Sequence, residues 1–213
     1  MSLVYQGNSA VFKVASMGHY DNNGYVLADP QSRDCYIVDA PDQIERLILE
    51  ASNFHVKGCI ITHAHPDHIA GHARLIELLD IPVLMHAKDS PRMDIPPYSF
   101  LNDGELLKIG NNTIEILHTP GHTQGGICLL LEECLISGDT LFPGGPGYTR
   151  TPEDFAQVVR SVKDRLLKLP EDTIVLPGHG EGTTIGDSKR EYDIFSAKNH
   201  LERPFGHVNW LTT

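Results

Sequence analysis

The chain has 213 residues and a formal net charge of −11, with 40% hydrophobic and 21% charged residues. This balance is typical of a globular protein and excludes a disordered or collagen-like chain. No apolar run approaches the roughly 20 residues of a membrane-spanning helix, and the acidic charge argues against a nucleic-acid surface, which needs clustered Lys and Arg. The length predicts a single domain over residues 1–213. The 12 histidines exceed an ordinary share several-fold and indicate a metal.

The first half of the chain alternates short strands with two helices. Apolar spacing predicts one helix from Pro41 and another over 69–79. A turn is expected at 21–24, and prolines predict a surface loop at 90–99. Strands are expected at 10–17, 24–29, 34–39, 56–62 and 83–86.

The second half is richer in strands. Thr151 and Pro152 predict the start of a helix over 154–169, because they suit the N-cap and the first helical position. A final helix is expected at 187–199, as the start of a short helical tail over about 187–213. Strands are expected at 105–109, 113–118, 127–131, 134–137 and 173–176. This order predicts an α+β fold with two mixed sheets and helices outside them.

The four cysteines lie in apolar, strand-like segments and have no C-x-x-C spacing, so we expect buried free thiols. No secretory signal is visible at the N-terminus. Both features favour a cytoplasmic location. The cysteines are Cys35, Cys59, Cys128 and Cys134.

A histidine-rich turn at 62–68 follows the buried strand predicted at 56–62. His63 and His65 alternate along the chain, so one extended segment can direct both at one ion. Asp67 and His68 follow Pro66, which bends the chain and lets them serve a second ion nearby. Imidazole and carboxylate together suit zinc, iron or manganese.

Three further candidates stand at the ends of predicted strands, each after a glycine that permits a sharp turn. They are His122, Asp139 and His179. Strand ends place such side chains along one rim of a sheet, so we expect them to join the 62–68 motif.

These motifs resemble the metallo-β-lactamase superfamily and, within it, the glyoxalase II-like (hydroxyacylglutathione hydrolase-like) hydrolases. The resemblance runs from about Phe12 to Thr184 and implies a four-layer αββα sandwich with a dinuclear metal site at one edge of the two sheets. It also implies that Asp39 orients a ligand imidazole. The implied ligands are His63, His65 and His122 for the first ion, Asp67, His68 and His179 for the second, and Asp139 between them.

Departures from the family pattern limit which subfamilies the sequence can resemble. Asp139 stands where some zinc β-lactamases carry a Cys ligand, which argues against penicillin hydrolysis. The bridging Asp and the last His are 179 − 139 = 40 residues apart, too close for the inserted domain of the nuclease branch. Only 213 − 179 = 34 residues follow His179, so the glutathione-binding helical segment is expected to be truncated or absent. The family's Cys-Gly-Lys/Arg is replaced at residues 145–148, so glutathione specificity is not implied.

The resemblance implies two divalent ions, zinc before iron or manganese, that share a bridging water and lower its pKa. Asp67 would orient this nucleophile and accept its proton. A thiolate leaves without a strong acid, which favours thioester or lactone cleavage over amide cleavage. An iron-dependent persulfide (sulfur) dioxygenase and a lactonase or ester hydrolase remain alternatives.

The expected partner is a small-molecule substrate, such as a glutathione or other thiol ester, with no nucleic acid and no membrane. A homo-oligomer is left open. Tyr148 and Arg150 are candidate substrate contacts beside the site. The basic residues Lys189, Arg190 and Lys198 on the last predicted helix are candidates for binding an anionic tail.

Overall fold

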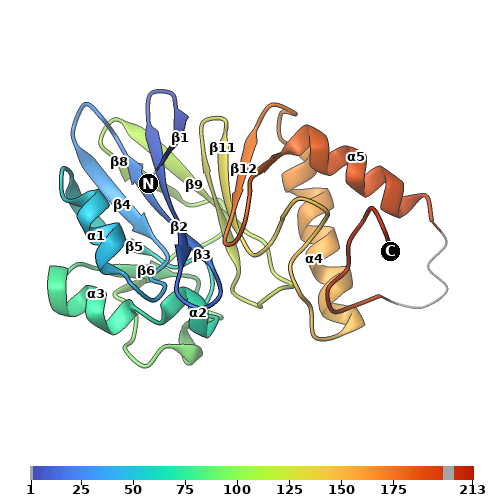
Figure 1. Cartoon of the computed structure of the whole chain (residues 1–213), viewed down its shortest axis with the longest axis horizontal. Helices are drawn as coiled ribbons and strands as arrows, with labels where there is room; N and C mark the ends of the chain where they lie inside the picture. The colour runs from blue at the N-terminus through green and yellow to red at the C-terminus, as the bar shows by residue number, and fades with distance from the viewer. Residues whose placement is uncertain (1, 199–203) are drawn as a thin grey trace.

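The computed structural model describes residues 2–198 and 204–213 and forms four layers, helix–sheet–sheet–helix (Figure 1). In this described part, sheet A has seven strands in sequence order, and sheet B has six in the order β13-β12-β11-β10-β9-β8. Sheet A comprises β1 (Ser2–Gln6), β2 (Ala10–Met17), β3 (Asn22–Ala28), β4 (Asp34–Val38), β5 (His55–Ile60), β6 (Val83–Met85) and β7 (Ser99–Phe100). Sheet B comprises β8 (Leu106–Ile109), β9 (Asn112–His118), β10 (Ile127–Leu131), β11 (Cys134–Gly138), β12 (Ile174–Pro177) and β13 (Thr183–Thr184). Both sheets mix parallel and antiparallel pairs, as expected.

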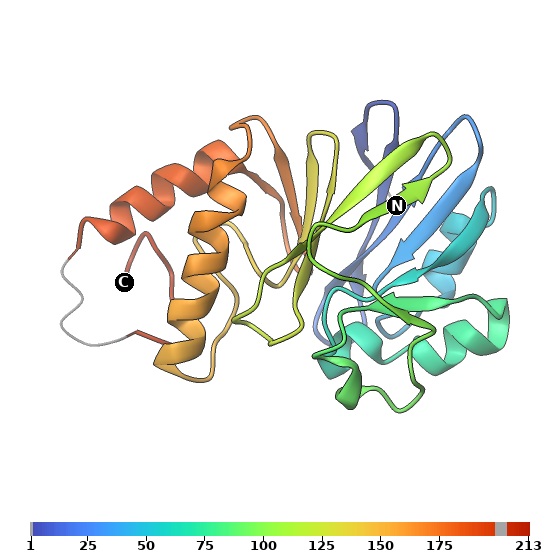
Figure 2. The same ribbon diagram turned by 180° about the vertical axis from the view of Figure 1, so that it is seen from behind.

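Helices cover the outer face of each sheet. Against sheet A lie α1 (Glu45–Ala51), α2 (Pro66–Ile69) and α3 (His72–Leu79), and against sheet B lie α4 (Pro152–Asp164) and α5 (Ile185–Ser196). The view from behind shows the same two flanks, with α4 and α5 in orange and red (Figure 2). The predicted αββα sandwich is therefore confirmed. Among the described residues, no helix has the length and apolar character needed to cross a membrane.

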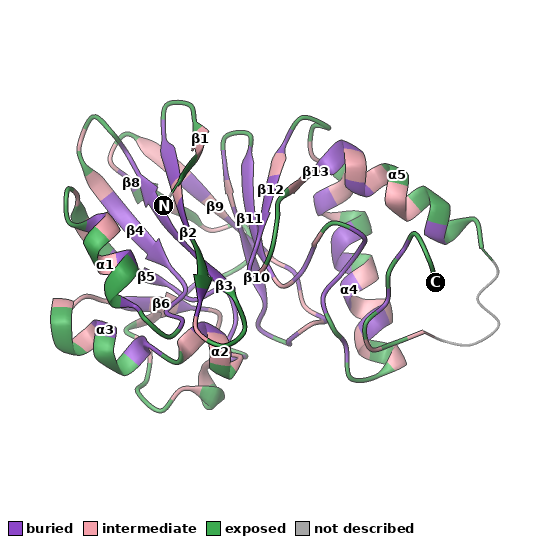
Figure 3. Ribbon diagram, in the orientation of Figure 1, coloured by how far each residue is buried: buried purple, intermediate pink, exposed green. Residues whose placement is uncertain are grey.

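Three apolar clusters fill the spaces between these layers. One lies between the sheets, with Val11, Ile60 and Leu129. A second joins sheet A to α1 and α3, and a third joins sheet B to α4, α5 and the buried Trp210. The strands are therefore largely buried while the outer helix faces are exposed (Figure 3). All four cysteines are buried free thiols, as predicted.

At one end of the sandwich, carboxylates in the turns form hydrogen bonds between the two sheets. Glu132, in the β10–β11 turn, accepts hydrogen bonds from the backbone N–H groups of Asn8 and Ser9 at 3.0 and 2.9 Å. Asp29, in the β3–β4 turn, accepts one from the N–H of Asn111 at 2.8 Å. The metal-ligand motifs follow the opposite ends of the strands, so these bonds fix the end of the sandwich away from the site.

Several elements differ from the predicted ones. The helix expected at 69–79 is divided into α2 and α3, because Gly71 packs against the chain at Pro41, where an added Cβ would lie 2.4 Å from a carbonyl oxygen. The helix expected to 169 ends at Asp164 and continues as a separate 3-10 turn, Leu166–Lys168. The last helix ends at Ser196, and residues 204–213 are not helical, in contrast to the helical tail expected there. Residues 199–203, which include the predicted end of that helix, lie outside the described part.

Candidate metal centre

Seven histidine and aspartate side chains converge at the rim where strands of both sheets end. Four come from the stretch that runs from the end of β5 through α2, at the edge of sheet A. The other three come from the segments that follow β9, β11 and β12 in sheet B. They are His63, His65, Asp67, His68, His122, Asp139 and His179. The structure therefore brings together all seven residues that the sequence motifs singled out.

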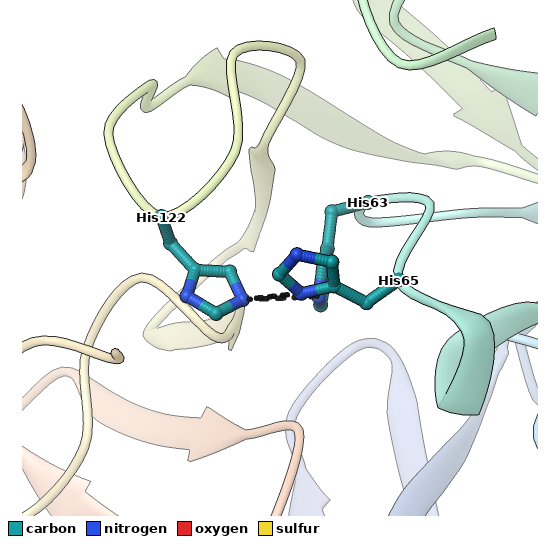
Figure 4. A group of neighbouring side chains, drawn as sticks. All are labelled: His63, His65 and His122. Atoms are coloured by element: carbon teal, nitrogen blue, oxygen red, sulfur yellow. Dashed lines mark hydrogen bonds between the residues drawn. The ribbon is translucent and has the colours of Figure 1, made fainter. Parts of the chain in front are cut away.

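One group consists of His63, His65 and His122 (Figure 4). His63 Nε2 lies 3.1 Å from His65 Nδ1 and 3.3 Å from His122 Nε2, and His122 Nε2 lies 2.8 Å from His65 Nδ1. Two of these imidazoles come from sheet A and one from sheet B, so the group spans the seam between the sheets.

A second group consists of Asp67, His68 and His179. His179 Nε2 lies 3.2 Å from Asp67 Oδ2 and 3.3 Å from His68 Nε2. Asp139 stands between the two groups: its Oδ1 lies 3.4 Å from His68 Nε2, and its Oδ2 lies 3.6 Å from His122 Nε2. Its carboxylate therefore faces both groups at once.

The donor atoms fit divalent ions. Zinc–nitrogen bonds of about 2.0–2.1 Å in a tetrahedron place neighbouring donors about 3.3 Å apart, close to the separations here. Asp139 Oδ1 is buried and makes no hydrogen bond to any described residue, which is costly unless another partner is present. Mixed imidazole and carboxylate donors suit zinc, iron and manganese alike.

The outward-facing nitrogens of two imidazoles donate to backbone carbonyls. His122 Nδ1 lies 2.7 Å from the oxygen of Tyr148, and His179 Nδ1 lies 2.8 Å from the oxygen of Tyr20. A carbonyl only accepts, so Nδ1 carries the hydrogen and Nε2 presents its lone pair to the centre. Asn22 also orients a donor, because its Nδ2 donates to Asp67 Oδ2 at 2.8 Å.

Asp39 lies behind the second group. Its Oδ2 lies 2.8 Å from His68 Nδ1, and its Oδ1 accepts a hydrogen bond of 2.7 Å from the backbone N–H of Thr62. The Thr62 hydroxyl also reaches Asp39 and lies 3.2 Å from His63 Nδ1. Asp39 has a φ of +60°, a left-handed conformation that Asp tolerates better than most residues. One buried carboxylate thus supports ligands of both groups.

The two groups differ in their electrostatics. Burial lowers the pKa of His63 well below its ordinary value and lowers the pKa of His65 to about 4, so both imidazoles are neutral near pH 7. Burial also opposes protonation of His68, but the carboxylates of Asp139 and Asp39 outweigh it and raise the pKa of His68. Burial alone would raise the pKa of Asp139, yet His68 and other imidazoles lower it. Positive charge is therefore favoured at the centre of the cluster.

The loops that carry the ligands are held by buried polar bonds. Asp89 is 1% exposed and accepts hydrogen bonds from the N–H groups of Ala64 and Gly125 at 3.0 and 2.8 Å, joining the two loops of the first group. Lys13 Nζ donates to the oxygen of Gly180, beside His179. At Gly178 an added Cβ would lie 2.3 Å from Asp139 Oδ1, so only glycine lets the His179 loop approach the centre.

A cavity of about 420 Å³ opens onto both groups, and His122, Asp139 and His179 line it. Tyr148 also lines this cavity and packs on His207, with ring centroids 5.0 Å apart. Arg150 lies elsewhere, on a second cavity beside His65. The two candidate substrate contacts therefore face different cavities.

The basic residues expected to bind an anionic tail have other partners. Lys189 pairs with Glu171 and Arg190 with Asp187, while Lys198 donates to the carbonyl of Leu211. None of the three lines the cavities at the metal centre. This prediction was wrong because position on the helix could not show which face meets the site.

Three further residues contribute to the site, although no sequence motif pointed to them. His207 follows the last helix and had no motif, but hydrogen bonds between Thr149 and Gly206 bring its segment to the cavity. Asn22 and Asp89 lie 45 and 25 residues from the groups they bond, so only the folded chain reveals their roles.

A profile of the metallo-beta-lactamase superfamily matches residues 21–179. The chain belongs to this superfamily. Together with its candidate metal site, this membership places it among metallo-hydrolases. The relatives with assigned activities include hydroxyacylglutathione hydrolase GloC of Haemophilus influenzae, which is 32% identical over 190 residues covering 78% of this chain and 90% of that protein.

Two solved structures share the fold over most of the chain. The B3 metallo-beta-lactamase BLEG-1 has a TM-score of 0.77 and 27% identity, covering 95% of this chain and all of that one. TTHA1623 in a di-iron-bound form has a TM-score of 0.72 and 30% identity, covering 84% of this chain and 97% of that one. The hydroxyacylglutathione hydrolase relative supports the glyoxalase II-like resemblance, and the two solved structures share the fold.

Proposed function

We propose that the protein is a metal-dependent thioester hydrolase with a dinuclear centre. The observation that carries the proposal is the pair of three-ligand groups with the Asp139 carboxylate between them, open to one cavity. A carbonyl group seated there would meet both groups together.

In this proposal each group would hold one divalent ion, and Asp139 would serve both. His63, His65 and His122 would hold the first ion, and Asp67, His68 and His179 the second. When bound, the ions would supply a water of lowered pKa and polarise the substrate carbonyl. Zinc is our first candidate, and iron or manganese would fit the same donors; the di-iron form of TTHA1623 shows that a related chain takes iron.

The chain's own residues would orient the reactants. Burial opposes ionisation of Asp67, but hydrogen bonding with His179 and the charge of His68 lower its pKa, so the carboxylate is ionised and can accept a hydrogen bond from the attacking water. The water oxygen bonds to the acyl carbon, the carbon–sulfur bond breaks, and its electron pair leaves with the sulfur. Asp67 would pass one proton of the attacking water to the departing sulfur, so the products are a carboxylic acid and a thiol.

A thiolate leaving group suits this site, because a thiol pKa near 8.5 allows departure without a dedicated acid. The name of the Haemophilus influenzae relative points the same way, to an acyl ester of glutathione. We also propose a cytoplasmic protein, since four free thiols are compatible with a reducing compartment.

Elemental analysis of freshly purified protein, with no metal added, is the first test. About two zinc ions per chain together with hydrolysis of S-lactoylglutathione or simpler thioesters would support the proposal. Hydrolysis of lactones alone would favour the lactonase. One iron per chain with oxygen uptake on glutathione persulfide would favour the dioxygenase. A β-lactam belongs in the same panel, given the similarity to BLEG-1.

The matched variants are His122→Ala and His55→Ala. His122→Ala removes a donor from the first group, so we expect loss of metal and a fall in turnover of more than about a hundredfold, since even outer partners of ligands cost 10–100-fold. His55 lies at the start of β5 with a 69% exposed side chain, and its loss should change neither. Equal loss in both variants would contradict the ligand assignment. His207 is unsuitable as the control because it lines the cavity.

A further inference from the structure

A second cavity of about 550 Å³ begins at His65, on another side of the metal centre. The start of α3 and the 92–95 segment form its walls, and Arg150 reaches it from the segment before α4. It therefore adjoins the proposed reaction site without being part of the first cavity.

Two unpaired guanidinium groups stand on this cavity. Neither Arg92 nor Arg150 makes a side-chain hydrogen bond or ion pair with any residue of the described part, whereas Arg74 and Arg165 are paired with carboxylates. In a chain of net charge −11, two free arginines on one cavity are a local excess of positive charge. Asp94 is the carboxylate on the same wall, and it too forms no ion pair with a described residue.

His72 supplies an independent observation. It lines the cavity and is only 4% exposed, yet its Nε2 has no hydrogen-bond partner among the described residues. Burial lowers the pKa of His72, so the neutral ring can offer a single N–H or a lone pair. A buried polar atom without a partner is costly, and His72 places such an atom in the wall of this cavity.

We propose that this cavity is a subsite for a carboxylate carried by one half of the substrate, bound by Arg92, Arg150 and His72. The inference rests on the proposed function: a thioester has two halves that diverge from its carbonyl group, and among the cavities that border the centre this one carries the two free guanidinium groups. Guanidinium groups match carboxylates in geometry and charge. The substrate class is then an acidic thioester, with the carboxylate in either the acyl half or the thiol half.

Three matched thioesters distinguish these sources: S-pentanoyl-N-acetylcysteamine, which is neutral; S-glutaryl-N-acetylcysteamine, with a carboxylate in the acyl half; and S-pentanoyl-N-acetylcysteine, with one in the thiol half. The metal-loaded protein is compared with Arg92→Gln and with Arg160→Gln, an exposed arginine on α4 that lines neither cavity. We expect Arg92→Gln to lower kcat/KM for one charged thioester about tenfold, through KM, and to leave the neutral one within about twofold. Arg160→Gln should leave all three unchanged.

Binding of glutarate, measured by calorimetry on the same three proteins, separates this proposal from the proposed function. Weaker binding in Arg92→Gln alone supports the subsite, even if no thioester is hydrolysed and the proposed function fails. Binding that does not depend on Arg92 overturns the subsite, whatever the proteins hydrolyse. An equal fall for all three thioesters in Arg92→Gln also overturns it, because that indicates a general effect of Arg92 on the centre.

Discussion

In three of the candidate ligand imidazoles, a hydrogen bond to the nitrogen that faces away from the centre sets the direction of the nitrogen that faces it. His122 and His179 give their Nδ1 hydrogens to backbone carbonyls, and His68 Nδ1 lies against Asp39. These bonds fix the orientation of the rings before any ion is present. The entropy lost in ordering the donors is therefore part of the free energy of folding and does not weaken ion binding. Asn22 does the same for the Asp67 carboxylate.

The buried thiols allow a prediction about pH and reactivity. Burial raises the pKa of Cys35 and Cys134 to about 12 and that of Cys128 to about 11. Because the thiolate reacts and its fraction at pH 8 is then on the order of 10⁻³ or less, we expect almost no labelling by a thiol-specific disulfide reagent in the native protein and four labels per chain after denaturation.

The pH profile of labelling checks the cause. Native-state labelling should still rise about tenfold per pH unit between pH 8 and 9, whereas labelling of the unfolded chain should level off above about pH 8.5. A thiol that reacts within minutes in native protein and levels off near pH 8.5 would contradict its burial.

The convergence of the seven candidate ligands could be predicted from the sequence, because each lies in a short motif beside a predicted strand. The other residues that shape the site could not. His72 appears in the sequence as one more helical histidine, and Arg92 as part of a proline-rich loop. Their shared cavity with Arg150 forms only when segments more than 50 residues apart pack together.

Hydrogen bonds between the loops that follow the strands set the geometry of the centre. Asp89 joins the His63–His65 loop to the loop after β9 through two backbone N–H groups. Asp89 forms no ion pair within the described part of the chain, so both of its carboxylate oxygens serve only these loops.

Asp89→Asn tests this joint. The amide would place an NH₂ group against one of the two N–H groups, leaving a buried donor unsatisfied at a cost of about 1–3 kcal/mol. We expect a lower urea midpoint for the metal-free protein and weaker metal retention. Asp172→Asn, an exposed carboxylate in the turn before β12, is the matched control. An unchanged urea midpoint for Asp89→Asn would contradict a stabilising role for the two hydrogen bonds of Asp89.

Long periodic elements were predictable, and short edge strands were not. β1, β7 and β13 were absent from the prediction because β7 and β13 have two residues each, and β1 is mostly exposed. Such strands form because a neighbouring edge offers hydrogen bonds, not because of their own pattern. The break at Gly71 likewise depends on Pro41, 30 residues earlier in the chain.

At the scale of the whole molecule, the proposed centre spans the two halves of the sandwich. Sheet A supplies four of the seven side chains and sheet B three. An ion bound by both would oppose their separation, since anything that binds the folded state alone stabilises it.

Removal of metal should therefore lower Tm. At free ion concentrations about a hundredfold above Kd, each ion adds about 2.7 kcal/mol. With about 2–4 °C per kcal/mol for a chain of this size, chelation should lower Tm by about 5–10 °C per ion. Differential scanning calorimetry before and after chelation, with elemental analysis of each sample, measures this. His122→Ala should show a smaller shift, and an unchanged Tm in fully stripped protein would show that the ions do not link the halves.

The order of the two sheets along the chain also affects how the protein is made. The ribosome synthesises all of sheet A, with its four candidate ligands, before it reaches His122, Asp139 and His179. An ion that meets the nascent chain at this stage finds half a site and exchanges freely. An ion that needs donors from both sheets would therefore bind with full affinity only after the second sheet has emerged and packed against the first.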